Sequence, residues 1–204
     1  DIALDAMMGL NASDPPLSVK LHASIGMDDI MRLAPAPVVP IIESLPKYEP
    51  LAVAVDVQGR MNSLAIDTLE VTLPRTLHLA AQGKVADYTD LNMALGSIRI
   101  NGELTGGESL KKSLLDAKLG RVVNVPPLTV RGVASVDRGV MNGNITVATG
   151  NGDIALKAMW NNRVNGYDID MAFNEFPVQN IMPSLGASNL TADISARGAG
   201  LDFF

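Results

Sequence analysis

The stretch LAVAVDVQG occupies residues 51–59, and apolar side chains stand at every second position of its first seven residues. Successive side chains of an extended strand point to opposite faces, so these apolar residues share one face. The stretches SLAIDTLEVTL at 63–73 and LHLAAQGKV at 77–85 continue the pattern. One buried apolar face and one solvent-exposed polar face are typical of strands in an antiparallel sheet. We therefore predict at least three consecutive half-buried strands.

Similar alternation recurs through most of the chain and predicts about ten strands in total. Turn-forming runs at 150–152 and 161–166 separate pairs of them, and Asn101-Gly102 and Asn142-Gly143 offer further positions tolerant of positive φ. We expect a mainly all-β fold, an antiparallel meander curled into a half-open trough (a β-taco) or closed as a sandwich. Alternation alone does not distinguish a lined groove from a filled core. The additional strands are expected at 17–25, 91–104, 128–136, 145–149, 154–160, 167–173 and 190–196.

Three short helical insertions interrupt the strands. The first is expected from Met27 to about Leu45, divided by three prolines, and its first turn carries Asp28 and Asp29, which favour a helix N-terminus. The second is expected over 108–119, followed by Gly120, and the third over 178–185. Each is expected to cap an end of the sheet or cover an apolar surface.

The composition excludes several classes of function. The chain has 204 residues, 47% of them apolar, a net charge of −6 and no cysteine. Scattered lysines and arginines form no basic stripe, so we expect no nucleic-acid partner. Without cysteine there is neither a disulfide nor a thiolate metal site. No apolar run approaches the roughly 18 residues of a membrane-spanning helix, so we expect none in this segment.

No catalytic motif emerges from the sequence, and we predict neither an enzyme nor a cofactor or metal site. Nucleophile elbows, zinc-binding helices and phosphate loops are all missing. His22 and His78 each fall on the polar side of a predicted strand, where exposure is the simpler interpretation. A β-fold glycan hydrolase would need converging carboxylates, whereas the acidic residues here are dispersed. Trp160, the single tryptophan, either marks an interface or a membrane boundary or packs in a core.

The succession of strand, terminal Gly59, short linker and two further strands over 51–85 resembles the repeating units of TamB-like and AsmA-like cell-envelope proteins, particularly those of Bacteroidetes. This resemblance implies a long β-sheet curled into a trough with an apolar inner surface, anchored in the inner membrane and reaching through the periplasm. It also implies participation in phospholipid transport and in outer-membrane protein assembly, with phospholipid acyl chains and an outer-membrane barrel assembly component as partners.

On this interpretation residues 1–204 form a single segment of a larger repetitive protein. A short similarity between 26–31 and 176–182 suggests tandem units over 1–175 and 176–204, the second one truncated. The alternative is a closed β-sandwich interaction module of the cell envelope with no internal ligand, to which partners bind by strand addition. The candidate groove lining is Val53, Val55, Val57, Leu64, Ile66, Leu69, Val71, Leu77, Leu79, Ile98 and Ile100.

Overall fold

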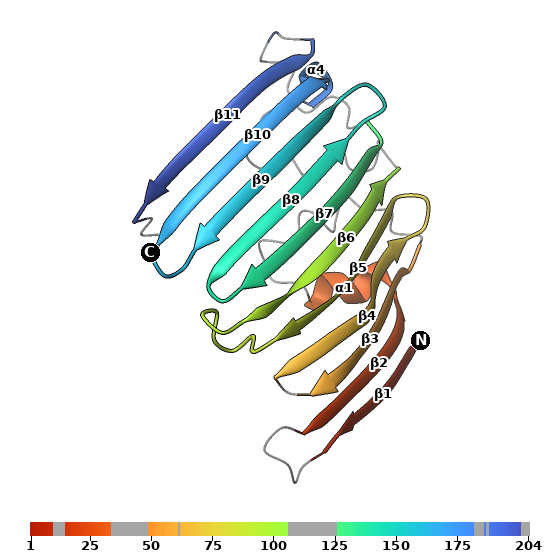
Figure 1. Cartoon of the computed structure of the whole chain (residues 1–204). Helices are drawn as coiled ribbons and strands as arrows, with labels where there is room; N and C mark the ends of the chain where they lie inside the picture. Colours follow the sequence, from red (N-terminus) through yellow and green to blue (C-terminus); the bar gives the residue numbers. More distant parts are fainter. Residues whose placement is uncertain are drawn as a thin grey trace.

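The computed structural model describes residues 1–9, 15–33, 49–60, 62–105, 126–181, 186 and 188–200. They form one antiparallel sheet of eleven strands in which each strand pairs with the next along the chain (Figure 1). The predicted antiparallel meander is therefore confirmed. The strands are β1 (Ile2–Met8), β2 (Pro16–Ile25), β3 (Leu51–Arg60), β4 (Ser63–Leu73), β5 (Leu77–Ala86), β6 (Leu95–Leu104), β7 (Leu128–Asp137), β8 (Val140–Ala148), β9 (Asp153–Asn161), β10 (Gly166–Phe176) and β11 (Leu190–Ala199).

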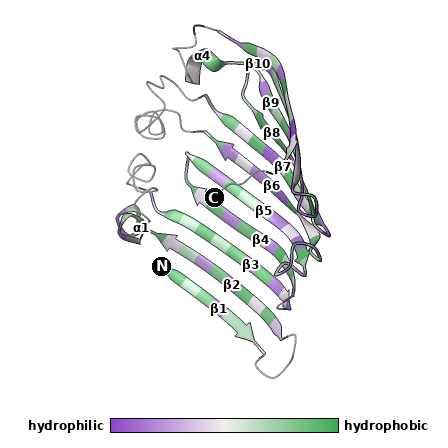
Figure 2. Ribbon diagram, turned by 90° about the vertical axis from the view of Figure 1, so that its left-hand side faces the viewer, coloured by the Kyte–Doolittle hydropathy of each residue, from purple (hydrophilic) through white to green (hydrophobic). Residues whose placement is uncertain are grey.

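The pairing register aligns apolar residues across the whole sheet. Leu21 lies opposite Leu4 and Val55, and Val55 in turn lies opposite Leu69. Because directly paired residues project to the same face, the alternation of each strand adds to that of its neighbours. One face of the sheet is thereby apolar from β1 to β11, and the other carries the polar and charged side chains. The bands of apolar and polar residues that alternate along the strands can be followed in Figure 2.

Two β-bulges keep the apolar side chains on one face where the alternation of apolar and polar residues shifts by one position. In β4 the register shifts between Ile66 and Leu69, with both Asp67 and Thr68 between them. In β10 it shifts between Phe173 and Phe176, and Glu175 between them has a φ of 47°. A bulge accommodates an extra residue and returns the next apolar side chain to the original face. Both halves of each strand consequently contribute to the same apolar surface.

The sheet is bowed, and its two helices lie on the concave side (Figure 2). They are α1 (Met27–Leu33) and α4 (Val178–Ile181). Met27 of α1 packs on Leu73, next to Leu51 and Leu77, all three of which belong to the apolar face. The apolar face is therefore the concave one. The described residues contain no second sheet opposite it, so they form the expected trough and not the closed sandwich.

The two ends of the strands differ in their connections. At one end, here called the helix end, the connections of 26–50, 105–127 and 177–189 follow β2, β6 and β10, and they alternate with tight turns at 74–76 and 149–152. At the other, the hairpin end, β1, β3, β5, β7 and β9 are followed by the connections 9–15, 61–62, 87–94, 138–139 and 162–165. A long connection thus recurs after every fourth strand. The helix predicted over 108–119 and the continuation of the first helix to Leu45 lie outside the described residues.

Candidate functional site

The concave face combines the inward positions of all eleven strands. Within those strands each of these positions holds an apolar or aromatic residue or glycine, and the polar groups among their side chains are the hydroxyl of Tyr167 and the indole N–H of Trp160. Eleven strands spaced about 4.8 Å apart and about eight residues long give this face an area on the order of 1,000 Å². The largest apolar patch on an ordinary soluble monomer measures roughly 300–600 Å². The concave face is thus larger than a monomer usually exposes.

Most of this apolar surface is open. Leu69, Leu79 and Ile100 near the middle of the face expose 39%, 38% and 36% of their area. Among the described residues the buried apolar side chains are few: Ala23, Met27, Leu73, Ala94, Phe176 and Val178. The face is therefore no ordinary protein core.

Glycines on the concave face permit the close approach of β5 and β6. A Cβ atom added to Gly83 would stand 2.2 Å from the backbone oxygen of Ser97, and one added to Gly96 would stand 2.2 Å from that of Lys84. Any side chain at either position would push the two strands apart. The two glycines therefore help to set the local curvature of the trough.

At the helix end the concave face is covered by apolar side chains. Leu73 is completely buried and Met27 is 2% exposed, with Ile30 and Met31 of α1 packed around them. Near the other edge of the sheet Phe176 is buried, its ring centroid 6.5 Å from that of Phe173 in an edge-to-face arrangement. The two predicted helices that the structure describes thus pack at this end, consistent with a capping role.

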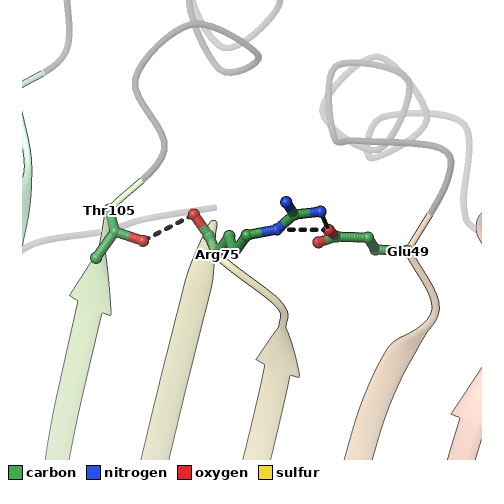
Figure 3. Close-up of polar contacts among 3 residues, drawn as sticks. All are labelled: Glu49, Arg75 and Thr105. Atoms are coloured by element: carbon green, nitrogen blue, oxygen red, sulfur yellow. Dashed lines mark hydrogen bonds and ion pairs between the residues drawn. The ribbon is translucent and has the colours of Figure 1, made fainter.

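Polar contacts join the strand ends at the helix end (Figure 3). The guanidinium of Arg75, in the turn between β4 and β5, donates hydrogen bonds to the carboxylate of Glu49, which precedes β3. The carbonyl oxygen of Arg75 accepts a hydrogen bond of 2.9 Å from Oγ1 of Thr105, just after β6. The amide of Thr105 also donates to the carbonyl of Thr76. One turn therefore joins the chain segments that border two long connections.

The hairpin end is built differently. Its turns are linked in a row by backbone hydrogen bonds, among them Asp87 N–H to Asn62 O and Asn162 N–H to Gly139 O. Asn162 Nδ2 also lies 3.4 Å from Asn92 Oδ1. Polar residues dominate this row, which we call the hairpin rim. It comprises the turns at 62, 87–94, 138–139 and 162–165, whose exposed apolar side chains are Leu91, Met93 and Val164.

Trp160 and Tyr167 lie on the concave face directly beside the hairpin rim. They are paired across β9 and β10, and Trp160 is also paired with Met141 of β8. Both aromatic side chains are partly exposed. The structure thus places the single tryptophan on the open apolar face, near its polar border.

The convex face carries paired charges. Lys20 Nζ lies 3.0 Å from Asp56 Oδ2, and Arg197 Nε lies 3.0 Å from Asp168 Oδ1. The hydrogen bond from Gln58 and the contact with Lys20 lower the pKa of Asp56. His78 lies between Thr72 and Glu70 with Nδ1 3.0 Å from the threonine hydroxyl. Both histidines lie on this outer face, as the sequence predicts.

A shallow hollow of about 420 Å³ lies on the convex face of β1 to β4. Its lining includes the small side chains of Ala3, Ala52 and Ala54 and the polar side chains of His22 and Glu70. No group of acidic or histidine side chains within the described ranges could hold a metal ion. Nor does any described helix have the length and apolar content to cross a membrane.

The register places all eleven candidate lining residues on the concave face. That list ends in β6, and sequence reasoning missed the equivalent positions of the flanking strands. The same alternation marks those positions in the sequence, so the signal for them was present. They include Leu21 in β2, Val130 in β7, Ile145 in β8, Leu156 in β9 and Ile169 in β10.

Comparison with known proteins identifies no relative: neither a family model, nor a curated protein, nor a solved structure matches the chain.

Proposed function

We propose that the chain is a section of an apolar trough that binds the acyl chains of phospholipids. The observation that carries this proposal is the concave face itself, which is apolar across eleven strands and open over most of its area. An extended apolar surface of this size marks a ligand or partner site. A concave shape suits flexible acyl chains, whose every methylene can touch the wall.

The energetics favour such an occupant. Removing a methylene group from water contributes about 0.8 kcal/mol of binding free energy. A bound acyl chain would remove from water both its own methylene groups and the apolar side chains that it contacts. No directional contact is required, and the side chains of the concave face offer none apart from the Tyr167 hydroxyl and the Trp160 indole N–H. A surface of this kind retains acyl chains without selecting one head group. Affinity would therefore follow chain length more than head-group chemistry.

We place this function in the bacterial cell envelope because of the resemblance to TamB-like and AsmA-like proteins. In that setting the chain forms part of a periplasmic trough, in a protein anchored in the inner membrane, and contributes to phospholipid transport or to outer-membrane protein assembly. An outer-membrane barrel assembly component is the proposed protein partner. We propose no catalytic step, because the acidic side chains within the strands lie on the convex face, away from the apolar surface.

The direct test is to purify the chain, extract it with organic solvent and identify bound lipid by mass spectrometry. Photo-crosslinking residues at Val55 and Ile66 should capture acyl chains in cells, because both face the trough. The matched control positions are Ala54 and Ala65, their chain neighbours on the convex face. Acyl chains should be captured at the first pair and not at the second.

A charge placed on each face sharpens this test. Val55→Asp sets a carboxylate on the apolar surface, where a bound chain would desolvate it, and should reduce co-purifying lipid severalfold. Ala54→Asp adds the same charge one residue away on the outer face and should leave the lipid content unchanged. Equal lipid content in the two variants, or no acyl chains in the parent protein, would contradict the proposal.

A further inference from the structure

We infer that lipids bound in the trough lie parallel to the strands, with head groups at the hairpin rim and chain ends directed toward α1 and α4. This inference rests on the proposed function and adds an orientation to it. An amphiphile aligns with a gradient of polarity, and the concave face offers such a gradient in one direction only. From β1 to β11 every strand presents the same apolar surface, so nothing orients a lipid along that axis.

Along the strands the two ends are opposite in character. At the helix end Met27 of α1 covers Leu73 of the apolar face, and five of the six buried apolar residues that the structure describes lie there. A polar head group would have to be desolvated against these side chains. At the hairpin end the face stops at a row of turns rich in Asn, Asp and Arg, which contact one another and leave a polar border. A head group there would keep its hydration.

The hairpin rim has the mixed chemistry of a bilayer interface. Arg138 and Arg163 are exposed beside the exposed apolar side chains of Met93 and Val164. Just inside this border, on the apolar face, stands Trp160, next to Tyr167. Tryptophan and tyrosine concentrate where a bilayer passes from hydrocarbon to head groups, because each ring combines an apolar body with a polar group.

The dimensions also agree. Ile154 at the helix end and Trp160 at the hairpin end are the outermost inward positions of β9, and Ile154 is paired with Phe173 of β10. Six residues of strand separate the two positions, or about 20 Å. One acyl chain in a bilayer spans about half of the hydrocarbon thickness, or about 15 Å. A single chain therefore fits between the aromatic pair at the hairpin rim and the apolar cover at the helix end.

The single tryptophan makes the orientation measurable. The protein is loaded with phosphatidylcholine that carries a nitroxide either close to the head group or at the methyl end of an acyl chain, and quenching of Trp160 fluorescence is recorded. We expect the head-proximal nitroxide to quench about twofold more strongly, because the two labels stand about 15 Å apart along the chain. In the double variant Trp160→Phe/Phe173→Trp the order should reverse.

A second tryptophan variant tests the orientation independently, in case the double variant does not fold. Leu128→Trp in the Trp160→Phe background places the indole at the helix end of β7, and it too should respond more to the methyl-end nitroxide. Equal quenching by the two lipids at every reporter, or an order opposite to the expected one, would overturn the inferred orientation while leaving lipid binding intact. Absence of quenching at all three positions, together with lipid-free extracts, would overturn the proposed function as well.

Discussion

The two faces of the sheet are made by the same strands but have opposite chemistry. In β3 the side chains of Val53, Val55 and Val57 enter the trough, while the intervening Ala54 and Asp56 face outward. Charged side chains within the strands are confined to the convex face, and several are paired there. A soluble protein normally hides its apolar face against a second layer. Here the described residues supply that layer only at the helix end.

This contrast separates two roles that apolar residues play on one surface. Beneath α1 the concave face is a small conventional core, since Leu73 has lost all contact with solvent. Elsewhere equally apolar side chains remain partly exposed, and only a bound ligand would bury them. The helix end should therefore govern the stability of the empty protein, and the open part should govern binding.

The largest effect should come from comparing two leucines of β4. Leu73→Ala removes a fully buried side chain and should lower the free energy of unfolding by about 2–5 kcal/mol. Leu69→Ala truncates a residue that is 39% exposed, and should cost clearly less, on the order of 1 kcal/mol, because little cavity remains. Urea denaturation of the lipid-free protein measures both.

Bound lipid should reduce the difference in free energy of unfolding between these two variants. The lipid covers Leu69, so truncating this residue then costs more, and lipid binding stabilises the native state by mass action. Similar losses for the two variants in the lipid-free protein would mean that the middle of the concave face is packed as a core. The division between a structural and a binding region of the face would then fail.

A smaller effect should distinguish two glycines of the concave face. Gly96→Ala would bring a methyl group to 2.2 Å from the Lys84 oxygen, so we expect a loss of about 1–3 kcal/mol as β5 and β6 separate. Gly143→Ala meets nothing within 4 Å and should be neutral or stabilise by about 0.4–1 kcal/mol, because it restricts the unfolded chain. Thermal unfolding followed by circular dichroism compares them, and equal losses would show that contact with β5 is not what requires Gly96.

The alternation of residues such as Val53 and Val55 was sufficient to predict the fold class and most strands. Sequence alone did not locate the first strand, Ile2–Met8, or the full length of β8, which starts at Val140. The Asn142-Gly143 and Asn101-Gly102 pairs were expected to offer positions tolerant of positive φ, but neither Gly102 nor Gly143 has a positive φ. They lie within β8 and β6, and the nearby turn is formed by Arg138 and Gly139, both at positive φ. Cross-strand pairing overrides local turn preference at such positions.

The candidate lining was partly predictable for a related reason. Ile66 and Leu69 are three residues apart, so simple alternation would put them on opposite faces, and only the bulge at Asp67 and Thr68 brings them together. The difference between the two strand ends was harder to foresee. It depends on which turns lie side by side, such as those of Asn92 and Asn162, and 70 residues of chain separate these two.

The smallest effect belongs to the convex face and concerns pH. Gln58 Nε2 donates a hydrogen bond of 3.1 Å to Asp56, and Lys20 lies close by; both favour the charged carboxylate and hold its pKa below 3.8. A depressed pKa stabilises the folded state above pH 3.8, and this stabilisation is lost as the pH falls through the folded value. Because Asp56 is open to solvent, the effect on stability should be slight.

Gln58→Ala should therefore raise the pKa of Asp56 toward 3.8, as followed by NMR of the side-chain carboxyl carbon during an acid titration. Gln82→Ala, on the convex face of β5, supplies the matched control and should leave that pKa unchanged. If both variants titrate like the parent protein, the hydrogen bond from Gln58 does not hold the carboxylate. If the lipid content stays constant in both while Val55→Asp loses it, charge chemistry on the convex face is independent of the apolar surface behind it.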